Sequence, residues 1–162
     1  MTDIELSING KTVRRSCEDH RLLVSFLRED LGLTGTHIGC DTTQCGACVV
    51  SVDGDTVKSC TMLAVQAHGR AITTIEGVSN GAALHAVQDA FHRHHALQCG
   101  YCTAGLVITA IDLIAREGRK LTRETVAHAL KGNLCRCTGY QNIITAILDA
   151  AGCLETPGQA AQ

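Results

Sequence analysis

The chain has 162 residues, a formal net charge of −2 and only 2% aromatic residues. This length suits one domain or two small ones, and the charge provides no basic surface of the kind that binds nucleic acid. Apolar residues make up 45% of the chain, but no run approaches the roughly 18 residues of a membrane span. The composition therefore argues against nucleic-acid binding and predicts no membrane-spanning segment.

The first strands and a helix are predicted near the beginning of the chain. Residues 4–8 alternate apolar and polar side chains, and the dipeptide Asn9-Gly10 predicts a tight turn into a second strand over residues 11–15. Asp19 is placed to cap a helix over residues 19–30, whose leucines and phenylalanine form an apolar stripe.

A loop with closely spaced cysteines follows, with the sequence GCDTTQCGAC over residues 39–48. Its C-x4-C-x2-C spacing is that of a plant-type [2Fe–2S] ferredoxin, whose fourth ligand lies further along the chain. Gly39 and Gly46 give the loop the freedom to wrap closely, and its N–H groups can then face cluster sulfurs. A structural zinc site is the alternative, although zinc more often takes two separated C-x2-C pairs. The predicted iron ligands are Cys40, Cys45, Cys48 and Cys60.

A second hairpin and a last strand complete the first half. Valines over residues 49–52 lead into Asp53-Gly54, a hairpin signal, and residues 56–57 return. Residues 72–75 are predicted as a short strand. These elements predict a small α+β domain over residues 1–77 in which a helix packs on a mixed sheet.

Beyond residue 77 the strand patterns give way to helical periodicity. We predict a helical domain over residues 78–154 and a disordered tail over residues 155–162. The predicted helices cover residues 82–95, 103–117, 122–130 and 140–150.

The helical half contains a second set of four cysteines, in one C-x2-C pair and one C-x-C pair. Each pair lies just before a predicted helix, so two loops can bring four thiolates to one point. The spacing leaves iron–sulfur and zinc open, and iron is favoured by the first site. Cys17 and Cys153 fall outside both sets and are predicted to be ordinary small side chains. The predicted ligands are Cys99, Cys102, Cys135 and Cys137.

No secretory signal is predicted, because the first seven residues are polar and lead directly into a strand. Ten cysteines in a secreted chain of this length would suggest disulfides. In the reducing cytoplasm, clustered cysteines are instead typical metal ligands. We therefore expect a cytoplasmic protein.

Nearly the whole chain, from Ile4 to about Ala151, resembles the small iron–sulfur subunit of the molybdenum hydroxylases, the xanthine oxidase family. The resemblance is carried by residues 39–48, by QCGYCTAG over residues 98–105, and by GNLCRCTGYQNI over residues 132–143. Within the family, residues 34–42 (TGTHIGCDT) and 57–62 (VKSCTM) are most similar to the small subunit of aerobic carbon monoxide dehydrogenase. Related hydroxylases of N-heterocycles share these stretches, so the substrate is left as carbon monoxide or an N-heterocycle.

The resemblance implies an α+β chain: an N-terminal β-grasp plant-type ferredoxin domain followed by a four-helix-bundle [2Fe–2S] domain. It also implies two [2Fe–2S] clusters here, with molybdenum–pterin dinucleotide on a large partner subunit and FAD on a medium one. Electrons would run from molybdenum through the helical-domain cluster and the ferredoxin-domain cluster to FAD. The family pattern places Gln98 and Cys137 against the pterin, and it implies a dimer of heterotrimers.

Two alternatives remain at the level of sequence. A freestanding two-cluster ferredoxin would dock transiently, although a diffusing carrier does not need an additional helical bundle. A zinc-stabilised interaction module would be colourless and contain no iron.

Overall fold

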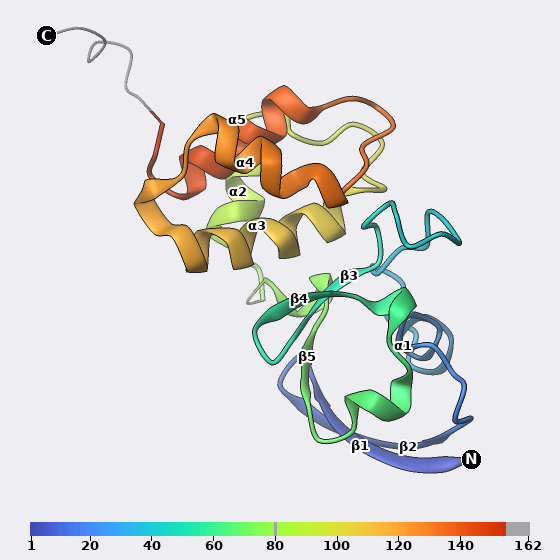
Figure 1. Cartoon of the computed structure of the whole chain (residues 1–162). Coiled ribbons are helices and arrows are strands. Elements are labelled where there is room, and N and C mark those ends of the chain that lie inside the picture. Colours follow the sequence, from blue (N-terminus) through green and yellow to red (C-terminus); the bar gives the residue numbers. More distant parts are fainter. Residues whose placement is uncertain (80, 155–162) are drawn as a thin grey trace, which may run out of the picture.

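The computed structural model describes residues 1–79 and 81–154 (Figure 1). The first half forms one five-stranded sheet in the order β2-β1-β5-β3-β4, in which β1 and β5 are parallel and the other neighbours are antiparallel. Both predicted hairpins are confirmed, and Asn9 and Gly10 both adopt positive φ at the first turn. The strands are β1 (Thr2–Ile8), β2 (Lys11–Cys17), β3 (Val49–Val52), β4 (Asp55–Lys58) and β5 (Ala71–Thr73).

The helix that packs on this sheet differs from the prediction at its start. It consists of α1 (Leu23–Ser25) continued by a π-helical turn over Phe26–Asp30, so the predicted start at Asp19 was wrong. Leu23 donates its backbone N–H to Met62 across the domain at 2.7 Å, and Arg21 donates to Glu18 at 2.9 Å, so residues 18–21 form a turn instead of the start of a helix. The Asp19 carboxylate instead accepts the hydroxyl of Thr2 at 2.7 Å.

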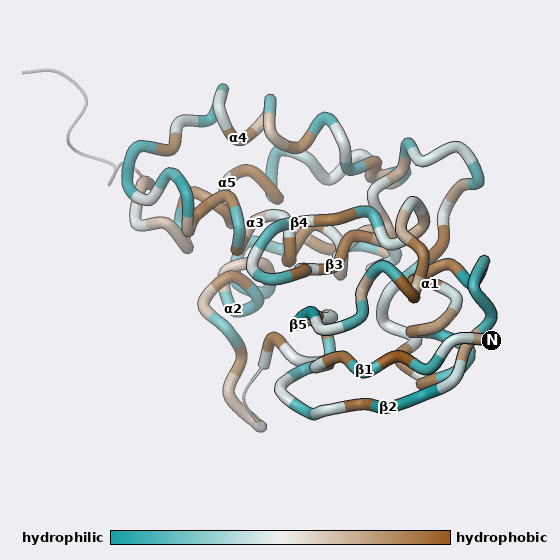
Figure 2. The backbone as a smooth tube through the Cα atoms, turned by 60° about the horizontal axis from the view of Figure 1, so that its bottom comes forward, coloured by the Kyte–Doolittle hydropathy of each residue, from teal (hydrophilic) through white to brown (hydrophobic). Residues whose placement is uncertain are grey.

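The alternating residues of β1 provide the core of the sheet domain, as the sequence pattern predicts. Ile4, Leu6 and Ile8 are buried, and the fully buried Phe26 and Leu27 pack with them. In Figure 2 the backbone of β1 alternates between apolar and polar colours, whereas β3 is apolar over most of its length. The reason is that α3 contacts β3 while Val50 and Val52 belong to the core of the sheet domain, so both faces of this strand are covered.

The last predicted strand is shorter than expected. It ends at Thr73 because Thr74 donates its backbone N–H to the Asn9 side chain at 2.9 Å, and Ile75 belongs to a 3-10 turn. The 3-10 turns of the described chain are Ser59–Thr61, Ala64–Ala67, Ile75–Gly77, Gly118–Lys120 and Leu130–Gly132.

Four helices form the second half, and three match the predicted segments closely. They are α2 (Ala86–Arg93), α3 (Thr103–Glu117), α4 (Arg123–Ala129) and α5 (Tyr140–Ala150). The first helix is shorter than predicted because His85 caps its start and His95 adopts a φ of 50°, which ends the helical path. The helices share one core that includes Phe91, Leu106 and Ile143, each at most 1% exposed.

The start of α4 shows how a threonine can complete a capping box. The Thr122 hydroxyl accepts the backbone N–H of Thr125 at 3.2 Å, and the Thr125 hydroxyl accepts that of Thr122 at 2.8 Å. Two orphan N–H groups are thus satisfied without the usual glutamate or glutamine.

The two halves meet where α3 lies against β3 and β4 (Figure 1). At this contact the buried carboxylate of Asp112 on α3 accepts the hydroxyl of Thr56 on β4 at 2.9 Å and pairs with Arg116. A buried charge needs such partners, so this group ties the helical half to the edge of the sheet.

Within residues 1–79 and 81–154, no helix is long and apolar enough to cross a membrane. The predicted disordered tail, residues 155–162, lies outside the described residues.

Candidate metal centres

The first four predicted ligands come together at one end of the sheet. The loop between α1 and β3 carries Cys40, Cys45 and Cys48, while Cys60 lies in the 3-10 turn after β4. Their side chains interact in two pairs, Cys40 with Cys45 and Cys48 with Cys60. A two-iron cluster needs two thiols for each iron, and the two pairs provide this arrangement.

The backbone of this loop is wrapped as tightly as the prediction requires, but not through the same residues. Gly46 has a φ of 71°, as expected, and Thr43 also adopts the left-handed region with a φ of 66°. Gly39 serves a different purpose, since a Cβ there would lie 3.1 Å from the Cys45 sulfur. Its lack of a side chain therefore leaves space beside the sulfur.

The thiols of the first quartet have pKa values shifted in opposite directions. Hydrogen bonds to the Cys40 sulfur, first from the Cys45 backbone N–H at 3.4 Å, lower its pKa to about 6. Burial, and then the hydrogen bond with Cys48, raise the pKa of Cys60 to about 11. A bound metal reverses the second effect, because its positive charge favours the thiolate.

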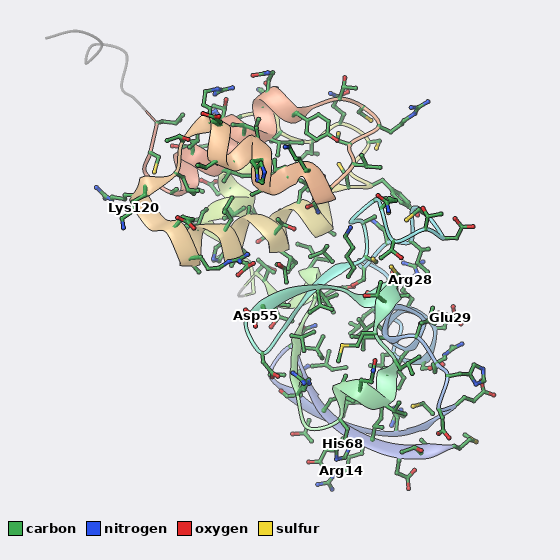
Figure 3. The ribbon with its side chains drawn as sticks, viewed as in Figure 1. Arg14, Arg28, Glu29, Asp55, His68 and Lys120 are labelled. Atoms are coloured by element: carbon green, nitrogen blue, oxygen red, sulfur yellow. The ribbon has the colours of Figure 1, made fainter. Side chains whose placement is uncertain are left out.

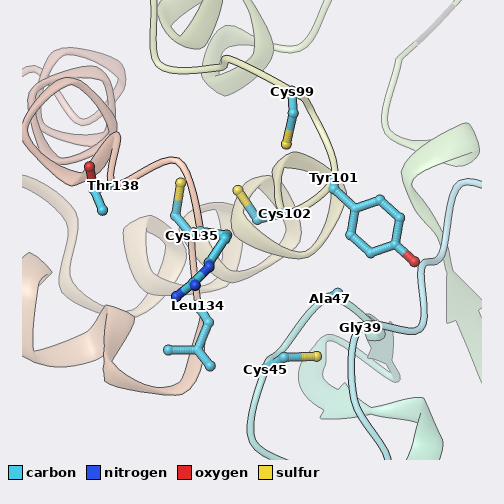
Figure 4. A pocket seen from close by; sticks show the side chains of 10 residues that line it. Gly39, Cys45, Ala47, Cys99, Tyr101, Cys102, Leu134, Cys135 and Thr138 are labelled. Atoms are coloured by element: carbon cyan, nitrogen blue, oxygen red, sulfur yellow. The ribbon is translucent and has the colours of Figure 1, made fainter.

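The second quartet is built from two loops of the helical half. Cys99 and Cys102 precede α3, and Cys135 and Cys137 lie between the 3-10 turn after α4 and α5. The Cys99 side chain interacts with Cys137 and the Cys102 side chain with Cys135, so each pair joins both loops. Figure 4 shows the sulfurs of Cys99, Cys102 and Cys135 directed toward one another.

This quartet repeats the electrostatic pattern of the first. The Tyr101 backbone N–H, and then the Cys137 thiol, lower the pKa of Cys99. Burial, and then the hydrogen bond with Cys135, raise the pKa of Cys102 to about 12. Gly139 donates its N–H to the Cys135 sulfur at 3.4 Å. In each quartet, backbone donors thus lower the pKa of one cysteine and burial raises the pKa of another.

The donor set fits iron–sulfur clusters. Eight soft thiols with backbone N–H donors suit iron bridged by sulfide. Among the described residues, no group of three or more His, Cys, Asp or Glu side chains is arranged around a single ion. Thr103, directly after Cys102, has a buried hydroxyl that finds no hydrogen-bond partner in the described part of the chain. The described residues therefore supply no hydrogen-bond acceptor for this hydroxyl.

The two quartets are neighbours. Leu134, next to Cys135, donates its backbone N–H to the Cys45 carbonyl at 2.8 Å. A cavity of about 420 Å³ lies between the loops and is lined by Cys45 on one side and by Cys99, Cys102 and Cys135 on the other (Figure 4). One hydrogen bond therefore connects the backbone of a cysteine in one quartet to the residue beside a cysteine in the other.

Gln98 and Cys137, which the sequence singles out together, are in contact. The Gln98 amide donates to the Cys137 carbonyl at 3.2 Å, and Gln98 is exposed. Two exposed leucines flank the cysteine motifs: Leu97, next to Gln98 in the chain, is 46% exposed, and Leu134, next to Cys135, is 55% exposed. Such side chains next to a metal site mark a surface suited to a partner.

Two supporting residues, Lys58 and Tyr140, were missed by the sequence reasoning. Lys58 donates its ammonium to the Thr43 carbonyl at 2.7 Å and so holds the first cysteine loop. Tyr140 accepts the Cys135 N–H at 2.7 Å and donates to the Asn133 carbonyl at 3.2 Å. The chain has only two tyrosines, both in the quoted motifs, and this was the available signal.

The histidine-rich run at the end of α2 has a different environment. His94 lies 2.9 Å from the Asp149 carboxylate of α5, which also binds Arg93 at 2.6 Å. This cluster of ion pairs connects the end of α2 to α5. Among the described residues, no group of three or more His, Cys, Asp or Glu side chains, these histidines included, is arranged to hold a single metal ion.

All ten cysteines lie in the described residues, and each is a free thiol. Cys17 is buried in the sheet domain, and Cys153 lies near the Gly118 carbonyl, 3.8 Å from its sulfur. Both belong to neither quartet, as the sequence predicts.

Comparison with known proteins gives matches over both halves. Residues 6–73 match the family described as a 2Fe-2S iron-sulfur cluster binding domain, and residues 74–148 match the [2Fe-2S] binding domain family. The nicotine 6-hydroxylase small subunit of Paenarthrobacter nicotinovorans is 47% identical over 150 residues, which cover 93% of this chain and 90% of that protein. The xanthine dehydrogenase iron-sulfur-binding subunit of Escherichia coli O157:H7 is 42% identical, over 90% of this chain and 92% of that one.

A solved structure agrees with these matches. Quinoline 2-oxidoreductase from Pseudomonas putida 86 superposes with a TM-score of 0.88 at 49% identity, covering 93% of this chain and 92% of that chain. The predicted particular likeness to carbon monoxide dehydrogenase stays a prediction.

Proposed function

Because the chain belongs to the small iron–sulfur subunits of the molybdenum hydroxylase (xanthine oxidase) family, we propose that it relays electrons from a molybdenum–pterin centre to FAD. It is a subunit of a multi-subunit oxidoreductase, and its two [2Fe–2S] domains each take one cluster. When bound, these clusters supply two one-electron carriers in series. The two electrons of a substrate oxidation can then leave one at a time.

The eight paired cysteines are the proposed iron ligands. In the first site one iron takes Cys40 and Cys45 and the other takes Cys48 and Cys60. The side-chain interactions within these two pairs support this division. In the second site the same argument assigns Cys99 with Cys137 and Cys102 with Cys135.

The observation that carries the relay is the contact between the two quartets. The Leu134 N–H to Cys45 carbonyl hydrogen bond of 2.8 Å brings the two cysteine loops together within one chain. Electron transfer weakens steeply with separation, so two adjacent carriers held by a short hydrogen-bonded bridge suit a relay. This contact argues against the zinc-module alternative, because inert structural ions gain nothing from such proximity.

The direction of the relay is proposed from the exposed surface. Gln98 and Cys137 lie together beside exposed Leu97 and Leu134, so we assign this face to the large molybdenum–pterin subunit. The loop around Cys40 then faces the medium FAD subunit. A dimer of such heterotrimers and a cytoplasmic location complete the proposal, because clustered metal-binding cysteines are typical of the reducing cytoplasm.

The relay is tested with Cys45→Ala in the intact complex. We expect substrate to reduce the helical-domain cluster while electron delivery to flavin fails, because the first cluster has lost a ligand. Stopped-flow spectra of the flavin and low-temperature EPR of the two clusters follow the steps separately. Flavin reduction at the wild-type rate in protein that lacks the first cluster's signal would contradict the proposed order.

We also propose that the complete enzyme oxidises an N-heterocycle or an aldehyde. The names of the related proteins carry this proposal: nicotine 6-hydroxylase and quinoline 2-oxidoreductase refer to N-heterocycles. Purified complex incubated with quinoline, nicotine, a simple aldehyde and carbon monoxide gives the answer directly. Turnover of carbon monoxide alone would overturn the proposal and support the particular likeness predicted from residues 34–42.

A further inference from the structure

One aromatic side chain joins the two cysteine loops. Tyr101 lies between Cys99 and Cys102, yet its ring stacks on His37 of the first half, with ring centroids 4.4 Å apart and planes inclined by 13°. Its hydroxyl donates to the Ile38 carbonyl at 2.8 Å. Figure 4 shows the ring extending from its own loop toward the segment that leads into Gly39.

His37 adds a second hydrogen bond between the same two loops. Its Nδ1 lies 2.8 Å from the Tyr101 carbonyl, and a carbonyl oxygen can only accept. Nδ1 therefore carries the proton in this arrangement. The two loops are thus joined by a ring stack and by two hydrogen bonds, one donated by each loop.

The segment before His37 is held by hydrogen bonds of its own. The His37–Tyr101 pair therefore connects two well-ordered loops. Arg28 donates to the carbonyls of Thr34 and Thr36, both at 2.7 Å (Figure 3 labels Arg28). His37 donates its backbone N–H to Ala47, inside the first cysteine loop, at 3.2 Å. Three residues after His37, the chain reaches Cys40.

We propose that His37 and Tyr101 form a clasp that sets the position of the helical-domain cluster loop relative to the ferredoxin-domain cluster loop. The inference rests on the proposed function, because the clasp acts on the spacing between two carriers. Neither residue is a ligand, and both are positioning residues. Loss of the clasp leaves the eight thiols in place but widens the distribution of distances between the two sites.

The experiment uses the intact complex with His37→Leu and Tyr101→Phe. The first variant removes the ring stack and one hydrogen bond, and the second removes only the hydroxyl. Thr2→Val is the matched control, because it deletes one exposed hydroxyl, which donates to Asp19 at 2.7 Å, on a strand that belongs to neither cysteine loop. Iron and sulfide are measured first in all four proteins.

Two readouts do not depend on turnover. The magnetic interaction between the two reduced clusters splits their EPR lines and reports on their separation. Hydrogen exchange at residues 37–40 reports on opening of the clasp. We expect exchange to accelerate about fivefold in Tyr101→Phe and about tenfold or more in His37→Leu, from the net strength of one hydrogen bond and of an aromatic stack. The splitting should broaden in the same order and remain unchanged in Thr2→Val.

The outcomes separate the clasp from the relay. Unchanged splitting and unchanged exchange in iron-replete His37→Leu would overturn the clasp while leaving the relay intact. Wild-type protein without two clusters would overturn the relay, and the exchange measurement would still decide whether the clasp exists. His37 lies outside both cysteine motifs, so a loss of iron in Tyr101→Phe alone leaves His37→Leu as the deciding variant.

Discussion

At Gly105, the contact between the two halves is too close to accommodate a side chain. It is the third residue of α3, and a Cβ built on it would lie 2.2 Å from the Gly46 carbonyl oxygen in the first cysteine loop. The loop cannot retreat, because on another side a Cβ at Gly46 would lie 2.3 Å from the Gly132 carbonyl. Gly105→Ala therefore forces α3 and the loop apart.

The size of the effect follows from this geometry. Real Cβ atoms essentially never come closer than 3.0 Å to such an atom, so the surfaces must separate by about 0.8 Å, the difference from 2.2 Å. Overpacking against a well-packed region destabilises a protein by roughly 1–3 kcal/mol. We take the upper value, about 3 kcal/mol, because the clash is with backbone atoms, which cannot rotate away. Alanine returns up to about 1 kcal/mol in helix propensity. The net loss is about 2 kcal/mol, or a melting temperature about 4–8 °C lower.

Thermal unfolding of the iron-replete protein measures this effect, with iron content determined before each scan. Gly132→Ala is the matched control, since a Cβ there meets only the far end of Lys58, at 3.8 Å. We expect the control to keep the wild-type melting temperature within about 2 °C, as a change without a steric clash should. A higher melting temperature for Gly105→Ala would show that helix propensity dominates and would refute the reasoning about the contact.

Thr122→Ala should cost about 1 kcal/mol in chemical denaturation, because it removes the cap of α4, and an unchanged midpoint would contradict the capping role. Phe91→Ala should cost about 3–5 kcal/mol by the same assay, since the ring is 1% exposed in the helical core; a loss below 1 kcal/mol would argue against that packing. Burial raises the pKa of Cys17, so its thiol should stay neutral and resist alkylation at pH 8 in the intact protein; rapid labelling there would show that the site opens. Removal of iron by chelation should lower the melting temperature strongly, because the binding energy of metals is also folding energy, and a stable apoprotein would disprove that coupling.

Much of the fold could be predicted because local patterns and global structure agree. The alternation over residues 4–8, the Asn9-Gly10 turn and the apolar stripes of α3 and α5 all gave the observed elements. Local signals failed where a distant contact decides. The residues around Asp19 form a turn, and the helix begins only at Leu23, which is hydrogen-bonded to Met62, almost forty residues further along the chain.

The candidate sites show the same division. Cysteine spacing alone grouped the eight thiols into two quartets, since local spacing encodes how a loop wraps a cluster. It could not place the quartets side by side, because that depends on the close approach of Gly46 and Gly105. Nor could it assign a role to Tyr101, whose partners His37 and Ile38 lie more than sixty residues away.

The central claim, two iron–sulfur clusters in one relay subunit, is tested most directly by metal analysis. The complex is purified from its source, and iron, acid-labile sulfide, zinc and molybdenum are measured per copy of this chain. The account predicts about four irons with matching sulfide and about one molybdenum, since two [2Fe–2S] clusters hold four irons. Zinc in place of iron, in a colourless protein without labile sulfide, would contradict it.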